Sequence, residues 1–487
     1  MSFIKNNKKT VAVAMSGGVD SSVSAIILKK KGFNVIGLSM RLIGDLYNVG
    51  LNEGQIEKSC CSISDIIDAK RVCVKLGIPH FVINLEDEFK ENVIDKFTRK
   101  YLEGKTPNPC ILCNKILKFD ILLKRAAQLG ADYLATGHYA RITKKLNGGF
   151  NLIKAKDPLK DQSYVLYNLN QESLSRLIFP VGNLYKSDIR KIALENGFNE
   201  ISKKKDSVEI CFIPDGNYHK FILNQLQAGG NNNTGKCDNE SCSGEFLNLK
   251  EETNGSSNHN SNHNSNHNSN NNSNINSGGN NSINSNSGGK IINNTYNNNN
   301  IRNNNIYNNP KNNNSNNSKN KVLITENDYK GYIKNMAGEI IGKHNGIFQY
   351  TVGQRKRLGI ASSQPLYVVK IDTQTKDIFV GAMNDCYSNE LYINDFNFID
   401  IEYKNKLLEQ VLTAKIRYSS LNYKCSAEVI NNEISDIIND DKNNNHIIKF
   451  KVKLKIKFKE PVKFITPGQS AVLYSGLKVI GGGIIEI

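Results

Sequence analysis

The sequence predicts an α/β fold at the amino end, built on a doubly wound parallel sheet, then a small helical central domain and a C-terminal β-barrel. Two observations lead to this fold class. Short apolar runs alternate with helical patterns through the first 170 residues, which is typical of a parallel sheet covered by helices. Beyond residue 328, short strands of alternating polarity are separated by glycine turns, as in small barrels.

The elements of the α/β domain, expected over 1–170, can be placed in order along the chain. An apolar run over 11–15 predicts the first strand, and the pattern after it predicts a helix over 19–30. Ser64 is expected to cap the next helix. The further strands are predicted at 33–42, 80–85 and 133–138, and the further helices at 66–76, 87–101 and 117–129.

The rest of the chain divides into three parts by composition. Residues 171–228 predict a mainly helical connecting domain, and residues 328–487 predict the barrel. Between them, 229–327 is dominated by Asn, Ser and Gly, including a repeated "SNHN". Such a tract buries too little apolar surface to offset its ordering entropy, so we expect a disordered insertion. Its histidines, and Cys237 and Cys242, are expected to take no part in chemistry.

Charge and cysteine content narrow the function classes. The formal net charge of +17 favours a polyanionic partner, with nucleic acid first. No apolar run approaches the length that spans a bilayer, so no membrane partner is expected. The sequence begins without the apolar centre of a secretory signal, so ten cysteines point to thiol chemistry or a metal site rather than a disulfide framework.

The stretch "VAVAMSGGVDSSV" predicts an anion site. Gly17 and Gly18 permit close backbone approach between a strand and a helix, and the helix presents its positive end. The lysine of a Walker loop is missing, which suits a pyrophosphate that leaves as a unit. Asp20 is placed to hold Mg²⁺ against the phosphates. The alternative is an ordinary strand-to-helix turn.

Several of these residues are expected to converge. The glycine loop, Met40 and Gly137 all fall at the carboxyl ends of predicted strands. In doubly wound sheets the ligand binds outside those ends, at the point where the strand order reverses. One crevice is therefore expected to collect all three.

Two cysteines stand in dense motifs far apart in the sequence. Cys113 lies in "TPNPCILCNKILKFD", after a proline-stiffened loop and close to the start of a helix, with Lys115 and Lys118 nearby. Such surroundings favour thiolate. Cys211 lies in "KDSVEICFIPDGNY". The pair suits sulfur transfer, in which one thiol carries a persulfide and the other resolves it. The alternative is a pair of buried structural thiols.

The stretch "SGGVDSS" resembles the PP-loop of ATP pyrophosphatases, which have the adenine-nucleotide α-hydrolase-like fold. Further motifs extend the resemblance to the tRNA-specific 2-thiouridylase family over nearly the whole chain outside the Asn-rich tract. They include "GLSMRL", "TPNPCILCNKILKF", "ATGHYARI", "KDQSYVLY", "FPVGNLYKSDIRKIA", "GEIIGKHNGIFQYTVGQRKRLGI", "AKIRYSS" and "PGQSAVLYSGLKVIGGG".

The resemblance implies a set of site residues. Cys113 matches the nucleophile, Cys211 matches the cysteine that receives the persulfide, and Asp20 is the catalytic carboxylate of the loop. The ATP-binding positions are Ala14, Met15, Ser16, Gly17, Gly18, Val19, Asp20, Ser21, Met40 and Gly137. Asn108, Pro109 and Cys110 match contacts to the target base. The other tRNA-contacting positions are His138, Lys160, Asp161, Gln162, Arg417, Tyr418 and Gln469.

The reaction that the resemblance implies is ATP-dependent 2-thiolation of the wobble uridine of tRNA. ATP with Mg²⁺ adenylates the uracil 2-oxygen, pyrophosphate and then AMP leave, and sulfur comes from the Cys211 persulfide. The partners implied are the tRNA anticodon stem-loop and a persulfide donor such as a cysteine desulfurase or a relay protein. The compartment inferred is the mitochondrion, with the cytoplasm as alternative.

Two alternatives stay open. Many relatives have Asp where this chain has Cys110, and Cys110, Cys113 and Cys211 together could hold an iron–sulfur cluster that delivers sulfide. In the other alternative the chain is a non-catalytic tRNA-binding protein. The barrel is expected to bind tRNA through the basic strand "KFKVKLKIKFK", whose lysines are otherwise only the solvated face of an alternating strand.

Overall fold

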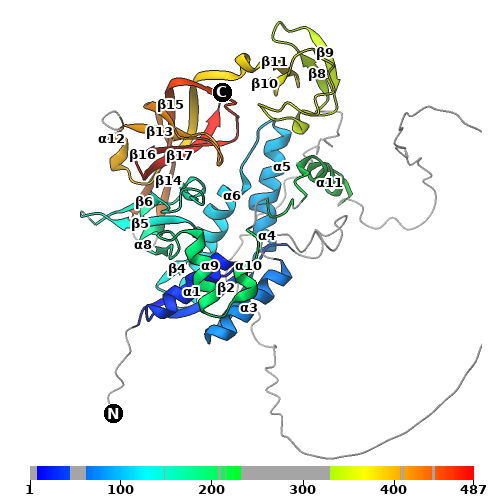
Figure 1. Ribbon diagram of the computed structural model, residues 1–487. Helices are drawn as coiled ribbons and strands as arrows, with labels where there is room; N and C mark the ends of the chain where they lie inside the picture. The colour runs from blue at the N-terminus through cyan, green and yellow to red at the C-terminus, as the bar shows by residue number, and fades with distance from the viewer. Residues whose placement is uncertain are drawn as a thin grey trace, which may run out of the picture. The chain divides into compact units, whose positions relative to one another are not determined.

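The computed structural model describes most of the chain outside the Asn-rich tract (Figure 1). The described residues are 8–43, 62–146, 148–206, 210–213, 215–231, 329–405, 407, 411–440 and 445–486. The predictions about the insertion, its histidines, Cys237 and Cys242 lie outside these residues. One compact unit comprises 1–233 and 323–487. None of the helices described is long and apolar enough to cross a bilayer.

A five-stranded parallel sheet forms the amino-terminal part, as the sequence predicts (Figure 1). Its order is β3-β2-β1-β4-β7, so the chain runs outward from β1 in one direction and then returns to the other side. The order therefore reverses between β1 and β4, beside the glycine loop. The strands are β1 Thr10–Ala14, β2 Asn34–Arg41, β3 His80–Asn84, β4 Tyr133–Ala135 and β7 Leu177–Ile178.

The helices follow the predicted order with two differences. Ser62, rather than Ser64, caps α3, because its hydroxyl accepts the Asp65 amide hydrogen at 3.2 Å. The helix that carries Cys113 begins at Pro109 rather than Leu117, because Asn108 caps it and Pro109 suits the first turn. These helices are α1 Val19–Lys30, α3 Ile63–Leu76, the run α4–η2–α5 (Glu86–Phe89, Lys90–Ile94, Asp95–Leu102) and the run α6–η3–α7 (Pro109–Leu112, Cys113–Ile121, Leu122–Gln128).

The segment after residue 154 is mainly helical, yet it is joined to the sheet. Its strand β7 pairs with β4, and α9 packs against α1. The helices are η4 Ser163–Leu166, α8 Gln171–Ser175, α9 Lys186–Glu195, α10 Asn199–Lys203 and α11 Tyr218–Asn231.

The carboxyl-terminal part contains two sheets (Figure 1). The first is a mixed four-stranded sheet of β8 Gly331–Lys334, β9 Ile340–His344, β10 Tyr367–Ile371 and β11 Ile378–Gly381. The second is a six-stranded antiparallel barrel of β12 Tyr387–Phe398, β13 Leu412–Lys415, β14 Tyr423–Asp440, β15 Asn445–Lys463, β16 Ser470–Ser475 and β17 Lys478–Glu486. Pairing of β12 with β17 closes the barrel.

The barrel core is supplied by alternate residues of its strands. On β15, Val452, Leu454, Ile456 and Phe458 are buried, while the lysines between them point away from the core. A hairpin from the amino-terminal half, β5 Ala140–Lys144 and β6 Phe150–Lys154, extends the same sheet through β17. The two halves of the chain are therefore joined by backbone pairing.

Candidate functional site

The loop between β1 and α1 has the geometry of an anion cradle. Gly17 has a φ of +68°, and a Cβ there would lie 2.3 Å from the Asp65 carbonyl oxygen, so only glycine fits. Gly18 is the N-cap of α1 and has no side chain to cap the first amides. Ser21 Oγ lies 3.2 Å from the Ser16 amide and donates to the Gly18 carbonyl at 3.1 Å. The first amides of α1 are thus left for an anion.

A pocket at the carboxyl ends of the strands collects most of the predicted ATP-binding residues. Its lining is Ala14, Met15, Ser16, Asp20, Ser21, Leu38, Met40, Lys118, Thr136, Gly137, His138 and Gln162. Gly17 and Gly18 lie in the same loop outside this lining, and Val19, the buried first residue of α1, is also outside it. A Cβ on Gly137 would lie 2.8 Å from the Ser21 amide nitrogen, so glycine here lets the end of β4 approach α1 closely.

Three lining residues were missed by the sequence reasoning: Leu38, Lys118 and Thr136. Lys118 follows Cys113 on the helical run α6–η3–α7, so the helix that carries the predicted nucleophile also forms one wall of the pocket. In the sequence, Lys118 stands out only as a cation near Cys113, and nothing there marks it as a residue of the nucleotide pocket.

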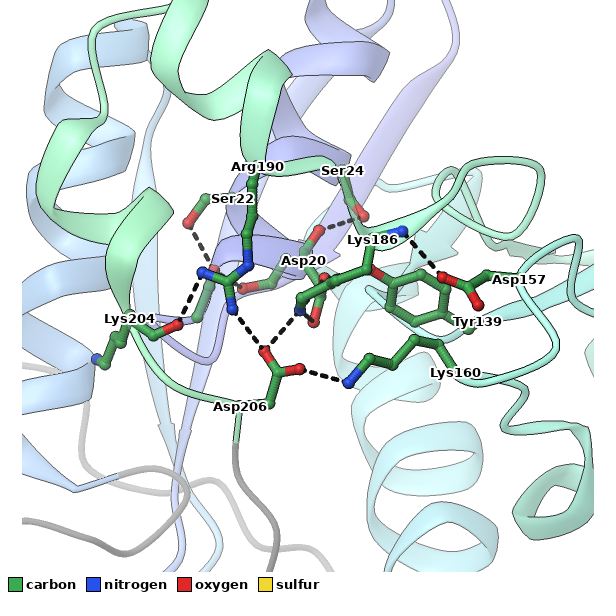
Figure 2. A network of polar contacts seen from close by, with 12 residues as sticks. Asp20, Ser22, Ser24, Tyr139, Asp157, Lys160, Lys186, Arg190, Lys204 and Asp206 are labelled. Carbon is green, nitrogen blue, oxygen red and sulfur yellow. Dashed lines mark hydrogen bonds and ion pairs between the residues drawn. The ribbon is translucent and has the colours of Figure 1, made fainter. Parts of the chain in front are cut away.

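Asp20 takes part in an ion-pair network (Figure 2). Both of its carboxylate oxygens accept from Lys186 Nζ at 2.8 Å, and Oδ1 also accepts from the Tyr139 hydroxyl at 2.7 Å. Burial and the charge of Asp20 raise the pKa of the Tyr139 phenol far above its usual range, so it stays a donor. Lys186 also lies 2.8 Å from Asp206 Oδ1.

The described residues do not offer a ready-made metal site. No group of three or more His, Cys, Asp or Glu side chains in the described part of the chain could hold a metal ion. Asp20 already has a cation in Lys186, which does not fit the predicted Mg²⁺ role. Cys110, Cys113 and Cys211 are all described and do not form a three-thiolate group, so these residues do not fit an iron–sulfur cluster as they stand.

The two predicted reactive cysteines border one apolar cluster. Cys113 is buried at the first residue of η3, near the start of its helix as predicted. Cys211 is half-buried and packs against the same cluster, beside Phe212. Phe212 makes edge-on ring contacts with Phe89 and Phe97, which fasten the Cys211 segment to the run α4–η2–α5.

Three other described cysteines have a different character. Cys73, Cys386 and Cys425 are buried in the cores. Burial raises the pKa of the Cys73 thiol to about 11 and that of Cys425 to about 12, and it also raises the pKa of Cys386. These thiols are kept protonated and unreactive at neutral pH.

The loop with the predicted base contacts is held at both ends. Asn108 Oδ1 accepts the amide hydrogen of Cys110 at 3.1 Å, and Cys110 is exposed. Gln469 Nε2, from the barrel, donates to the Thr106 carbonyl at 2.7 Å. A Cβ on Gly468 would lie 2.8 Å from the Thr106 nitrogen, so this turn packs directly on the loop.

The predicted tRNA contacts Lys160, Asp161 and Gln162 are consecutive in the chain but make different contacts. Lys160 donates to Asp206 Oδ2 at 2.7 Å, whereas Asp161 accepts from Ser163 Oγ at 2.8 Å and from backbone amides. Gln162 lines the pocket and accepts from the Tyr139 amide at 2.9 Å. Lys160 and Asp161 therefore do not line the pocket, and their side chains form hydrogen bonds within the protein.

His138 forms part of the pocket wall. Its Nδ1 lies 2.7 Å from Thr136 Oγ1, and its ring packs against Phe119 and Phe179. Burial, assisted by the charge of Lys118, holds the pKa of His138 well below its usual range. The imidazole is therefore neutral at physiological pH.

Arg417 and Tyr418 come from the barrel. Arg417 Nη2 donates to the Phe464 carbonyl at 3.2 Å. Tyr418 is 43% exposed and lies edge-on to Tyr164, with Lys415 above its ring at 5.4 Å. Burial raises the pKa of Tyr418, and the charge of Asp161 adds to the rise.

Comparison with known protein families gives three matches along the chain. Residues 9–215 match a "tRNA methyl transferase HUP domain", 321–382 a "tRNA methyl transferase PRC-barrel domain" and 440–485 an "Aminomethyltransferase beta-barrel domain". In that order they define a class of HUP-domain proteins that carry a PRC-barrel and a carboxyl-terminal β-barrel.

Curated relatives narrow the class to one family. A tRNA-specific 2-thiouridylase MnmA from Clostridium acetobutylicum is 36% identical over 99% of this chain and 100% of its own length. One from Geobacter metallireducens is 33% identical over 98% and 97%. The chain belongs to the tRNA-specific 2-thiouridylase family. Among solved structures, a 4-thiouridine synthetase–RNA complex with bound ATP matches with a TM-score of 0.29 and 19% identity, over 45% of this chain and 50% of that one.

Proposed function

We propose that this protein is an ATP-dependent sulfurtransferase that 2-thiolates a uridine in tRNA. The observation that carries the proposal is the pocket itself, because the glycine loop and the helix of Cys113 form walls of the same cavity. The adenylated base would therefore form beside the helix that carries Cys113, although neither Cys113 nor Cys211 lines the pocket itself. Similarity to 2-thiouridylases over nearly the whole chain supports the same reaction.

The first step makes the uracil 2-oxygen a leaving group. The oxygen attacks the α-phosphorus of ATP, and pyrophosphate departs toward the glycine loop. There the turn at Gly17 leaves room for it, and the first amides of α1 donate hydrogen bonds to it. Neutral His138 and Gln162 line the cavity without adding charge beside the adenylate. Asp20 is bound to Lys186, so it would not itself hold a Mg²⁺ ion that accompanied the nucleotide phosphates.

The second step exchanges oxygen for sulfur. The terminal sulfur of a Cys211 persulfide attacks carbon 2 of the base, and AMP leaves with the former oxygen. The Cys113 thiolate then attacks the Cys211 sulfur, which forms a Cys113–Cys211 disulfide and frees the 2-thio base. A thiol reductant restores both thiols with two electrons before the next turnover. Alternatively, Cys113 first releases the persulfide sulfur as hydrosulfide.

The proposed partners follow from the positive net charge of the protein and from the need of the reaction for a sulfur source. The target is the wobble uridine, which must leave the anticodon stack at a cost of a few kcal/mol. Asn108, Pro109 and Cys110 contact it, and the partly exposed Tyr418 adds a contact to the tRNA from the barrel. A persulfide protein, such as a cysteine desulfurase or a relay protein, supplies the sulfur. The mitochondrion stays the predicted compartment.

The test is thiolation of tRNA with ATP, Mg²⁺ and a persulfide donor. We expect Cys113→Ala and Cys211→Ala to abolish thiolated nucleoside while tRNA-dependent ATP–pyrophosphate exchange persists. Cys386→Ala, which removes a buried thiol from the carboxyl-terminal part of the chain, is the matched control. Full activity of both cysteine variants would refute the sulfur-transfer scheme, and binding of tRNA without any exchange would point to the non-catalytic alternative.

Cys110→Ser separates the two sulfur routes. In the persulfide route the hydroxyl is tolerated and an iron-free enzyme is active. In the cluster route the variant loses both activity and iron. Mass analysis of the product nucleoside also separates thiolation from the methylation named in two of the matched family descriptions, because the two modifications differ in mass.

A further inference from the structure

Phe464 lies in the turn between the barrel strands β15 and β16, and its backbone conformation is unusual for its residue type. Its φ is +60°, in the left-handed region that a bulky side chain rarely occupies. Strained residues of this kind persist only where the surrounding structure holds them, and they gather at functional sites. The contacts that hold Phe464 therefore indicate what the strain is for.

The ring of Phe464 packs on the part of the chain that forms the mixed sheet. Gly353 has a φ of +90°, and a Cβ there would lie 2.8 Å from Phe464 Cδ1, so only glycine leaves room for the ring. The Tyr367 ring, on β10, has its centroid 5.7 Å from that of Phe464. The Phe464 amide donates to the Cys386 carbonyl at 2.9 Å, just before β12. These contacts fix both the side chain and the backbone of Phe464.

The carbonyl of Phe464 accepts two hydrogen bonds. Arg417 Nη2 donates to it at 3.2 Å, and Thr466 Oγ1 donates to it at 3.0 Å. The guanidinium carbon of Arg417 also lies 5.8 Å from the centroid of the Phe464 ring, within the range of a cation–π contact. Because the backbone dihedral angles set the direction of a carbonyl, relaxation of the left-handed φ would turn the acceptor away from Arg417.

Arg417 is half-buried and is held through one nitrogen of its guanidinium. Within the described part of the chain, its side-chain hydrogen bonds all come from Nη2, to the carbonyls of Phe464 and, at 3.4 Å, Lys463. The remaining N–H groups are thus left for a phosphate, which arginine binds through charge-assisted hydrogen bonds. Arg417 is also one of the tRNA contacts that the family resemblance implies.

The same turn reaches the loop that carries the predicted base contacts. The Thr106 amide donates to the Pro467 carbonyl at 2.9 Å, and Thr106 Oγ1 lies 3.4 Å from Thr351 Oγ1. Thr351 is two residues before Gly353, on which the Phe464 ring packs. The turn at Phe464 therefore joins Arg417, the mixed sheet and the base-contacting loop.

We infer that Phe464 is a positioning residue for tRNA binding: its ring, packed on Gly353, keeps its backbone left-handed, and that backbone keeps its carbonyl on Arg417. The guanidinium is thereby held in one orientation before tRNA arrives, which lowers the ordering cost of binding. The contacts of the ring offset the strain of the backbone. The inference rests on the proposed function, since the polyanion that meets Arg417 is the tRNA of that reaction.

The first measurement asks whether Phe464 holds Arg417, and it needs no tRNA. Phenylglyoxal modifies guanidinium groups, and peptide mass spectrometry of the full-length protein compares Arg417 with Arg125, an exposed arginine of α7 that serves as internal standard. In Phe464→Ala we expect Arg417 to react about fivefold faster than in the wild type, as the loss of one hydrogen bond implies. Phe464→Tyr keeps the ring and should react at the wild-type rate.

The second measurement asks whether this hold matters for tRNA. The probe is an unmodified tRNA transcript with uridine at the wobble position, titrated by filter binding at several salt concentrations. Arg417→Met should lower the slope of log affinity against log salt by about 0.7–0.9, the value for one phosphate contact. Phe464→Ala should weaken binding about fivefold, and it should have no further effect in the Arg417→Met background, because it acts through that arginine.

Phe464→Gly separates the backbone of this residue from its ring. Glycine adopts the left-handed conformation without strain, so this variant should keep more tRNA affinity than Phe464→Ala, although both lack the ring. A position without left-handed backbone would show the reverse order, because glycine loses more conformational freedom on folding.

Phe398→Ala is the control for the loss of an aromatic ring. Phe398 is another half-buried phenylalanine of the barrel, so its replacement should leave the labelling of Arg417 and the tRNA affinity unchanged. Far-UV circular dichroism during denaturant unfolding identifies any variant that does not fold. If Phe464→Ala is one of them, Phe464→Leu, which keeps apolar volume without the aromatic ring, takes its place.

The outcomes separate this inference from the proposed function. Equal labelling of Arg417 in the wild type and in Phe464→Ala would overturn the inference, whatever the protein does to tRNA. Weaker tRNA binding by Phe464→Gly than by Phe464→Ala, or additive losses in the double variant, would overturn it as well. A wild type that does not bind the transcript would instead refute the proposed function, while the labelling of Arg417 still decides whether Phe464 holds the guanidinium.

Discussion

Single residues define the anion cradle more sharply than any other part of the site. Gly17 combines two constraints: a left-handed backbone, and a Cβ position that the Asp65 carbonyl already fills. Gly137 adds a third, since it lets β4 end against the first turn of α1. A side chain at either position would push apart the elements whose ends make the pocket.

Gly17→Ala tests this arrangement against a matched control. Gly32 also has a positive φ, +85°, but a Cβ there meets nothing within 4 Å. Gly32→Ala should therefore cost only the left-handed strain, about 1–2 kcal/mol of unfolding free energy. Gly17→Ala should cost more and should weaken ATP binding at least about tenfold, because the loop must move away from Asp65. Denaturant unfolding and equilibrium dialysis measure both quantities.

Equal effects of the two variants on ATP affinity would mean that the contact with Asp65 does not shape the cradle. The comparison is clean because both glycines lie outside regular helix and strand, and both give up the same backbone freedom. Only the neighbouring carbonyl differs.

At the scale of elements, the sequence predicted which strands and helices exist and where the glycine loop lies. Apolar runs over 11–15 and 33–42 sufficed for β1 and β2, because buried parallel strands are continuously apolar. The helix of Cys113 was predicted to begin too late, since Asn108 and Pro109 were interpreted as loop rather than as cap and first turn. Propensity alone does not distinguish these two roles.

Contacts between distant elements were beyond the sequence. Nothing in its periodicity shows that Gln469 reaches Thr106, that β7 completes the first sheet, or that β5 and β6 extend the barrel sheet. The ion pairs of Lys186 with Asp20 and Asp206 were missed for the same reason: the three residues are separated along the chain, and charged residues usually indicate only a solvated face.

The turn before β16 provides the element-scale prediction. Gln469→Glu replaces the donor to the Thr106 carbonyl with a carboxylate, so the two oxygens repel. We expect a loss of about 1–3 kcal/mol in unfolding free energy and a lower tRNA affinity, because the loop with Asn108 and Cys110 loses its attachment. Gln374→Glu, an exposed turn residue on the mixed sheet, is the control for the added charge.

ATP binding should be unchanged in Gln469→Glu, because Gln469 does not line the nucleotide pocket. A variant that binds tRNA normally, measured by filter binding at one fixed salt concentration, would show that the barrel does not position the base-contacting loop. The fixed salt matters because phosphate contacts make RNA affinity strongly salt-dependent.

At the scale of the whole molecule, the compact unit is assembled from both ends of the chain. Residues 1–233 and 323–487 form it together, with the barrel closed by β12 and β17 and joined to the amino-terminal half through β6. Closure removes the exposed strand edges that would otherwise invite aggregation. The sequence predicted a barrel, but not that an amino-terminal hairpin extends its sheet.

This assembly predicts that residues 234–322 can be replaced. A Gly/Ser linker of about 20 residues has an average span of about 25 Å, and the entropy of closing a loop changes only slowly with its length. Every pocket residue and both ion pairs of Lys186 lie within the compact unit. The shortened protein should therefore melt within about 3 °C of the full chain and keep its ATP and tRNA affinities. Differential scanning calorimetry and binding titrations measure these values.

Loss of the unfolding transition would assign residues 234–322 a part in folding. Weaker tRNA binding with unchanged ATP binding would assign them a part in RNA recognition. A linker of twice the length is the control, because it would restore a protein whose only defect is a linker too short to connect the two ends.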